Sequence, residues 1–197
     1  MKTGVVFSVI GILFTVVNDH SQAQYMGKIQ PMKMAAAEAL WDSEDPAAMS
    51  LFTIGDEKNR KDVFAIRVPG LLSFMSYNKF TGKVLGINDI QEEYVEKYGP
   101  GDYVPPVAIS YWMFRVMVGA GMVMLLIAGL LLISVLRDKL EFKPLWLKIL
   151  LWAIALPYIA NSAGWIFTEM GRMPWAVFGV MRVETAVSTS VSAGEVL

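Results

Sequence analysis

An arginine and a methionine stand two positions apart in a stretch that is otherwise uncharged. Arg115 is the only charged residue between Val104 and Leu136. An ionised group at the centre of a membrane costs roughly 3 kcal/mol, so it usually faces a partner and marks function, although an arginine near a helix end can instead extend to the interface. Met117 has the thioether of an axial haem ligand, but a methionine in an apolar helix is far more often packing. Their spacing predicts different helix faces for the two side chains.

A second group with chemical potential is Trp165, Glu169 and Arg172. Their i, i+4 and i+7 spacing predicts one face of a helix, which Gly171 and Pro174 would end. One interpretation is an interfacial aromatic belt with an i,i+3 ion pair. The other is a carboxylate that binds a metal and is held ionised by the neighbouring arginine.

The third group, Lys33 and Glu38, falls in a short helix predicted over 32–41, with Pro31 at its start. Taken alone, this helix is amphipathic with two solvated charges, because a separation of five residues lies outside the favourable i,i+4 pairing. The only histidine, His20, lies in a polar stretch and is predicted to be solvated rather than a ligand.

Three apolar segments organise the chain around these residues: 3–18 and 149–168, which carry no charge, and 104–136, whose one charge is Arg115. A helix needs about 20 apolar residues to cross a bilayer, and the second and third segments satisfy that. They predict spanning helices over 105–136 and 148–172. The first is short. It is either a signal peptide with a cleavage site near Ser21-Gln22-Ala23-Gln24 or, over 1–17, the tail of a truncated spanning helix.

A polar region over 18–104 separates the first two segments and holds nine Lys and Arg against thirteen Asp and Glu. A short strand is expected over 63–68 and a charged helix over 89–97. The positive-inside rule places the basic connector 137–147 in the cytoplasm, and the acidic loop and Glu169–Arg172 outside. Residues 173–197 are then expected to form an outer re-entrant or interfacial segment. The predicted fold is an all-α integral membrane protein, a transmembrane helix bundle fragment with a long mixed polar loop on the outer side.

Composition excludes several classes of site. The chain has no cysteine, which rules out disulfides, thiolate metal sites and iron–sulfur clusters within it. The net charge of −1 gives no indication of a nucleic-acid partner. With 55% hydrophobic and only 18% charged residues, against about 25% charged in soluble domains, the chain is a membrane protein. Three functions stay open: a redox enzyme, a transporter without haem whose pathway Arg115 and Glu169 line, and an anchored assembly protein.

Taken together, three stretches resemble the large subunit (subunit I) of cytochrome bd-type quinol oxidases. The last of them is similar to the family signature G-W-x-x-x-E-x-G-R-Q-P-W, and the others to its F-R-x-M-V helix and to the start of its quinol-binding loop. The matching residues are Gly164-Trp165, Glu169, Gly171-Arg172 and Pro174-Trp175; Phe114-Arg115, Met117-Val118; and Gln30-Pro31-Met32-Lys33-Met34-Ala35-Ala36 with Glu38.

This resemblance implies haem-binding roles. Met117 would bind the iron of a low-spin haem b, with Arg115 beside that haem. Glu169 would bind the iron of a high-spin haem b, with Trp165 and Arg172 near it. The family's third cofactor, haem d, would be held mainly by parts absent from this chain.

The resemblance also implies an activity and its partners. Lys33 and Glu38 would serve quinol oxidation, and the protein would reduce oxygen to water in aerobic respiration as part of an electron-transport chain. It would work with a second oxidase subunit in the lipid bilayer of the bacterial cytoplasmic membrane, as a multi-pass protein.

Two departures from the family pattern are visible. Met173 stands where the signature has glutamine, which removes an amide beside the expected haem site. The family's histidine ligands come from helices that precede this chain, and a further helix follows it. The resemblance therefore implies a fragment at both ends, inactive alone, and favours a truncated helix over a signal peptide for 1–17.

Overall fold

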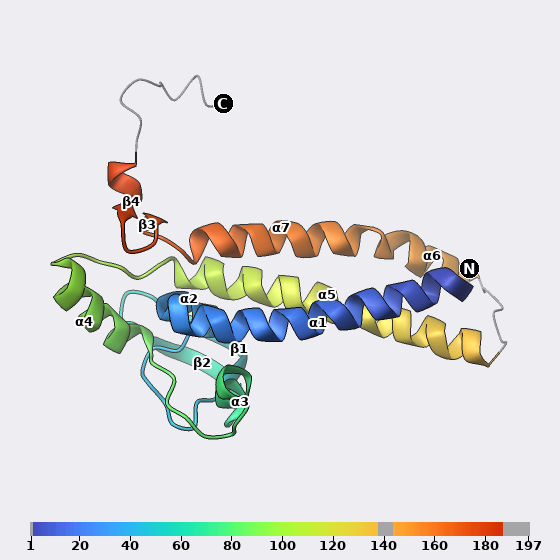
Figure 1. The fold of residues 1–197 in the computed structure, drawn as a ribbon, viewed down its shortest axis with the longest axis horizontal. Coiled ribbons are helices and arrows are strands. Elements are labelled where there is room, and N and C mark those ends of the chain that lie inside the picture. Colours follow the sequence, from blue (N-terminus) through green and yellow to red (C-terminus); the bar gives the residue numbers. More distant parts are fainter. Residues whose placement is uncertain (1, 138–143, 187–197) are drawn as a thin grey trace, which may run out of the picture.

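The computed structural model describes residues 2–137 and 144–186. Three long helical segments lie side by side, and a smaller body of short helices and strands gathers at one end of them (Figure 1). In chain order the elements are α1 Lys2–Ile29, α2 Pro31–Glu38, β1 Met49–Asp56, β2 Lys61–Val68, α3 Leu71–Tyr77, α4 Ile87–Tyr98, α5 Val107–Leu136, α6 Pro144–Ala153, α7 Ala155–Met170, β3 Trp175–Val177, β4 Met181–Arg182 and the 3-10 turn η1 Val183–Thr185.

Among the residues that the structure describes, three segments are long and apolar enough to cross a membrane: α1, α5 and the α6–α7 segment from Trp146 to Met170. The first helix does not end near Val17, where its apolar part ends, but continues through polar residues to Ile29. A helix is ended by its capping chemistry and packing rather than by the loss of apolar residues. The uncharged stretch 3–18 therefore marks only the part of α1 that is suited to lipid.

The third segment, predicted as one helix over 148–172, is a candidate span from Trp146 to Met170 with a local break. It is divided between α6 and α7 at Ile154, and α7 ends at Met170. Proline has no N–H group and its ring clashes with the carbonyl four residues earlier. For Pro157 that carbonyl belongs to Ala153, the last residue of α6, which accounts for the break.

The body at the end of the long helices corrects the all-α prediction. Strands β1 and β2 form an antiparallel hairpin with two irregularities in register, and β3 and β4 form a second, very short one. The strand expected over 63–68 is part of β2. Its partner β1 was not predicted, because Ser50, Thr53 and Gly55 interrupt the apolar alternation that identifies strands.

Helix α2 lies at the centre of this body and packs against α1, α4 and α5. It begins at Pro31 as expected, and Ala35, Ala36 and Ala37 are at most 1% exposed. Small side chains let α2 approach α5 closely. The charged helix predicted over 89–97 is α4, whose inner face buries Ile87, Ile90, Gln91 and Tyr94.

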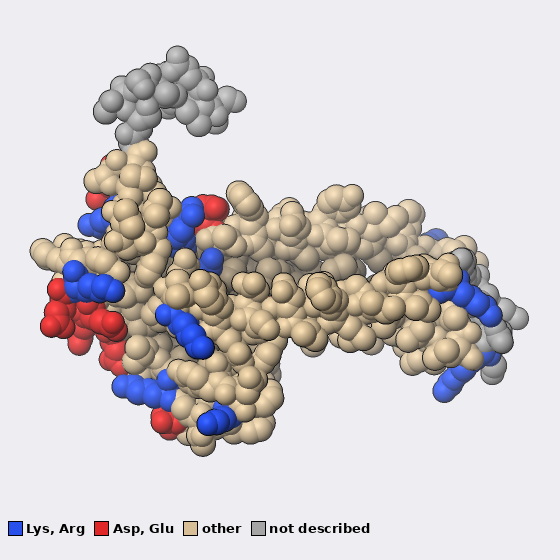
Figure 2. Space-filling model, viewed as in Figure 1, with Lys and Arg blue, Asp and Glu red and all other residues tan. Residues whose placement is uncertain are grey.

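Charged side chains gather at the two ends of the long helices and are absent from their visible middle (Figure 2). This is the distribution that a membrane-crossing segment requires. Residues 138–143 of the basic connector predicted over 137–147, and residues 187–197 of the segment predicted over 173–197, lie outside the described residues. The assignment of the loop body to the outer side remains a prediction.

Candidate functional site

Arg115 forms a buried ion pair with Glu38. Its Nη2 lies 2.8 Å from Glu38 Oε2, and the side chains are 14% and 3% exposed. Nη2 also donates to Ser50 O at 2.6 Å and Nη1 to Ala37 O at 3.3 Å. The guanidinium lies 4.5 Å from the ring centroid of Tyr111, one helical turn earlier on α5. The arginine side chain therefore does not extend into solvent; it joins α5 to α2 and β1.

The Glu38 carboxylate receives two hydrogen bonds on one oxygen, Oε2: from Arg115 and, at 3.0 Å, from the backbone N–H of Ser50. Burial raises the pKa of Glu38 above its usual range, and the charge and hydrogen bond of Arg115 oppose that shift. Neither bond engages Oε1. The prediction that Glu38 is solvated is wrong, because α2 lies inside the body rather than on its surface.

Two residues of this site carry no motif and were missed. The hydroxyls of Ser50 and Tyr111 lie 2.8 Å apart, and Ser50 Oγ also lies 2.6 Å from Thr53 Oγ1. All three side chains are at most 2% exposed. The i−4 position of Tyr111 relative to Arg115 could have indicated its role. Nothing in the sequence indicated a role for Ser50, because Ser50 is brought to Glu38 only by strand β1, which was not predicted.

Lys33 points to a different neighbour, although it lies on the same short helix as Glu38. Its Nζ donates to Thr168 O at 3.3 Å and lies 5.0 Å from the ring centroid of Phe167 on α7. Burial lowers the pKa of Lys33, and the nearby Arg172 lowers it further. The structure thus gives the two residues predicted for one quinol site separate sets of contacts, one on each side of α2.

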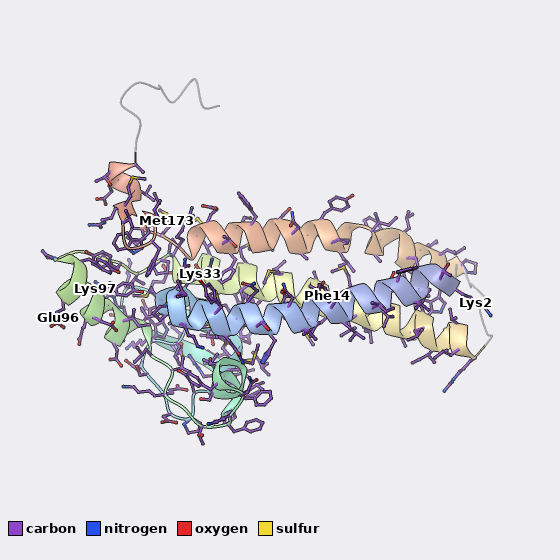
Figure 3. All side chains as sticks on the ribbon, viewed as in Figure 1. Lys2, Phe14, Lys33, Glu96, Lys97 and Met173 are labelled. Carbon is purple, nitrogen blue, oxygen red and sulfur yellow. The ribbon has the colours of Figure 1, made fainter. Side chains whose placement is uncertain are left out.

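Glu169 and Arg172 are paired at the end of α7, with Arg172 Nη2 2.5 Å from Glu169 Oε2. The pair is partly exposed, at 40% and 34%. Trp165, one turn earlier, is 68% exposed. Figure 3 labels Lys33 and Met173 close to this end of α7, and both line one small pocket with Arg172.

Met117 leaves α5 on a different face from Arg115, as their spacing predicted, and lies against α7. A Cβ atom built on Gly164 would lie 2.8 Å from Met117 Sδ, so the glycine provides the space that the thioether occupies. One turn away, the rings of Phe114 and Phe167 lie 5.2 Å apart. The glycine of the G-W pair therefore has a structural role beside Met117.

An aromatic cluster fixes the chain that follows Arg172. Trp175 stacks on Tyr103 at 5.6 Å and meets Tyr98 edge-on at 5.0 Å. Tyr94 contacts both tyrosines. This cluster holds the β3–β4 hairpin against α4 and so restricts where Arg172 can lie.

The donor set is of a kind that fits a haem. Within residues 2–137 and 144–186 no three His, Asp or Glu side chains converge, as a zinc site would need. Iron in a porphyrin takes only one or two ligands from protein, which a lone thioether such as Met117 or a lone carboxylate such as Glu169 can supply. In the described residues the buried Nε atoms of Arg115 and Arg172 have no hydrogen-bond partner, and haem propionates are anions of the kind that they bind.

Comparison with known proteins identifies the family of this chain. Residues 1–197 match the family of cytochrome bd terminal oxidase subunit I. The chain belongs to that family. The resemblance to subunit I, which three stretches of the sequence indicated, is therefore confirmed.

Individual relatives of this subunit I chain show how much is shared. Cytochrome bd ubiquinol oxidase subunit 1 of Bacillus subtilis is 50% identical over 181 residues, covering 90% of this chain and 38% of the relative. A putative cytochrome bd menaquinol oxidase subunit I of the same organism is 34% identical, covering 92% and 39%. The structure of bd oxidase from Geobacillus thermodenitrificans matches with a TM-score of 0.77 and 30% identity, over 99% of this chain and 41% of that one.

The chain thus spans about two fifths of the length of these relatives. Membership of the subunit I family, with three candidate membrane spans among the described residues, makes it a mostly helical part of a membrane protein. The individual roles of Lys33, Glu38, Met117 and Glu169 stay predictions.

Proposed function

We propose that this chain contributes the quinol-oxidising loop and two haem ligands to a terminal respiratory oxidase that oxidises quinol and reduces oxygen to water. The observation that carries the proposal is the buried pair of Glu38 and Arg115 at the end of a candidate span, in a chain of the subunit I family. Family membership favours the oxidase over a transporter or an anchored assembly protein, the alternatives that composition left open.

Glu38 is the group suited to accept a proton from quinol. A general base must be ionised and within hydrogen-bond reach of the hydroxyl that it deprotonates. Arg115 favours the ionised carboxylate, whereas burial favours the protonated one, and this balance lets the group change its protonation state. The bonds to Oε2 fix the orientation of the carboxylate and leave Oε1 for the substrate hydroxyl.

Lys33 serves the same reaction from the opposite side of α2. Its ammonium group is held by Thr168 O and the face of Phe167, next to Arg172. A cation in this position stabilises an anion nearby, either an ionised quinol oxygen or a haem carboxylate. This role requires the charge of Lys33 rather than the transfer of its proton.

Met117 and Glu169 would hold a low-spin and a high-spin haem b through their iron atoms, and haem d would be held mainly by parts outside this chain. When bound, the haems carry the electrons of quinol to oxygen. Arg172 fixes the Glu169 carboxylate, and Gly164 leaves room for the Met117 thioether. Arg115 and Arg172 offer donors to the anionic edge of such a group.

The complete oxidase would include a second subunit and lie in the bacterial cytoplasmic membrane, with the loop body facing outward. Protons released from quinol at Glu38 would then leave on the outer side. This chain alone would not turn over.

The proposal is tested in the complete oxidase with the Arg115→Leu variant. We expect quinol-driven oxygen uptake to fall by about two orders of magnitude, because the arginine keeps Glu38 ionised and oriented. Chemical reduction of the haems by dithionite should remain complete. Arg60→Leu is the matched control, since Arg60 forms a partly exposed 3.4 Å pair with Asp102 and should leave uptake unchanged. Normal uptake in Arg115→Leu would contradict the proposal.

A further inference from the structure

The β1–β2 hairpin buries polar side chains and exposes apolar ones. Its buried side chains, Ser50 and Thr53, are polar and at most 2% exposed. Its outward side chains are large and apolar. The exposed set is Leu51, Phe52, Ile54, Val63, Phe64 and Ile66, each between 39% and 69% exposed. A sheet bathed in water shows the opposite pattern, with polar residues outward.

Four of these side chains form one continuous face. Phe52 is the register partner of Ile66, and Ile54 is the partner of Phe64. Partners in an antiparallel pair point to the same side of the sheet, so the two pairs lie next to each other. The rings of Phe52 and Phe64 lie 6.3 Å apart across the strands. We call these four residues the hairpin face.

The hairpin face continues onto a candidate membrane span. Phe52 packs edge-on against Trp112 of α5, with ring centroids 5.2 Å apart. At 100° per residue, Trp112 lies on one side of α5 with other apolar side chains that are also exposed. This stripe comprises Ile109, Trp112, Val116, Val123, Leu126 and Leu130. The hairpin and the span therefore share one apolar surface.

Two contacts fix the depth of the hairpin along α5. Ser50 O accepts from Arg115 near the start of β1, and Glu57 Oε1, just after the end of β1, accepts from the backbone N–H of Ala108 at 2.6 Å. The hairpin thus lies beside the first two turns of α5. The 30 residues of α5 span about 45 Å at 1.5 Å each, against about 30 Å for a hydrocarbon core. This excess leaves room for its first turns to lie at the membrane boundary.

The turn of the hairpin supplies charges suited to that boundary. Lys58 and Lys61 are exposed, and Arg60 is half-buried beside Asp102. Basic side chains next to an apolar surface with aromatic rings are typical of segments that lie in the interface, where they meet anionic phosphates. A protein partner gives no reason for this combination.

We propose that the hairpin face lies in the outer headgroup–acyl boundary of the bilayer and contacts phospholipid chains directly. The hairpin is then an interfacial anchor that does not cross the membrane. Because its inner face binds Arg115 and Glu38 through Ser50, the anchor holds that pair at the depth of the headgroups. The inference concerns the surface of the loop and does not depend on the haem or quinol assignments.

The test uses the complete oxidase in vesicles of phosphatidylethanolamine and phosphatidylglycerol, without quinol. A single nitroxide label is attached at Phe64→Cys or, in a second variant, at Ile54→Cys, after any cysteines elsewhere in the complex are replaced; this chain has none of its own. Collision of the label with oxygen, which concentrates in lipid, is compared with collision with a water-soluble nickel chelate. Glu93→Cys on the exposed side of α4 is the control.

We expect oxygen to relax the labels at Phe64 and Ile54 severalfold more strongly than the nickel chelate, with the reverse at Glu93. Stronger relaxation by the nickel chelate at both hairpin sites would mean that the face is in water. Protection from both reagents would mean that protein covers the face. Either result would overturn the proposal.

Discussion

Arg115 Nη2 lies 2.8 Å from Glu38 Oε2, so the one arginine of a candidate span is paired with the carboxylate that ends the short helix α2. Removing one partner of a buried pair costs about 3–5 kcal/mol, because the other charge is left uncompensated. The pair therefore couples the loop body to the span. It also places the predicted proton acceptor where the chain enters the membrane.

Glu38→Gln keeps the shape and hydrogen-bonding capacity of the side chain but cannot accept a proton at neutral pH. We expect quinol-driven oxygen uptake by the complete oxidase to fall about 10²-fold or more, the size of a general-base contribution. The haem absorption spectrum should be unchanged. Glu96→Gln, at an exposed position on α4 (Figure 3), is the control and should have normal uptake. Equal rates in the two variants would refute the role of Glu38.

The pH profile of uptake gives a second test of Glu38. Burial raises its pKa, so the protonated form, which cannot accept a proton, persists to higher pH than for an ordinary glutamate. Activity should decline as the pH falls through this raised value, and the decline should be absent from the residual rate of Glu38→Gln. The stability of the protein depends on pH in the opposite direction. Because the folded state binds the Glu38 proton more tightly than the unfolded state, the contribution of this proton to stability is lost as the pH rises through the raised pKa. An acid limb that persists unaltered in Glu38→Gln would assign it to another group.

Met117→Leu preserves size and apolar character but removes the thioether. We expect the low-spin haem b bands to be lost or shifted in the spectrum of the reduced complete oxidase, because leucine cannot bind iron. Met122→Leu, at a 67% exposed position on the same helix, is the matched control. An unchanged low-spin spectrum in Met117→Leu would remove Met117 from the ligand set.

Gly164→Ala tests the same site without touching the ligand. The new Cβ would lie 2.8 Å from Met117 Sδ, and the flexible thioether must move to admit it. The fold should tolerate this, so the melting temperature should change little while the low-spin haem b spectrum or its reduction potential shifts. Gly129→Ala, with nothing within 4 Å of the added Cβ, should change neither. A shift of equal size in both variants would contradict a specific role for Gly164.

The sequence predicted much of this site because the decisive side chains lie in local helical motifs. Pro31 begins a helix, the carboxylate and guanidinium of Glu169 and Arg172 are three residues apart, and spacing alone separates the faces of Arg115 and Met117. Each of these depends on chain geometry within two turns. Local spacing is sufficient for such features.

Contacts between residues far apart in the chain could not be predicted from the sequence. Glu38 and Arg115 are 77 residues apart and meet only because three alanines let α2 approach α5. Of the β1–β2 hairpin, only part of β2 was predicted. The buried side chains of β1 are polar, so the usual assumption that buried residues are apolar fails there. Lys33 and Glu38 contact different elements. This difference likewise depends on where α7 ends and not on the five-residue separation of the two residues.

Lys33→Gln removes the ammonium group between α2 and α7 but keeps a donor for Thr168 O. We expect a lower rate of quinol oxidation, because glutamine cannot stabilise an anion as a cation does. Lys28→Gln, at an exposed position at the end of α1, should leave the rate unchanged. Oxygen uptake over a range of quinol concentrations measures both. Unaltered turnover in Lys33→Gln would count against its part in the reaction.

The most direct test of the central claim is the optical spectrum of the complete, detergent-solubilised oxidase containing this chain, recorded as quinol and then oxygen are added. We predict haem bands, including a Soret band, that quinol reduces and oxygen reoxidises. The complete complex without any Soret band, or with haem that quinol does not reduce, would contradict the assignment of this chain to a working quinol oxidase.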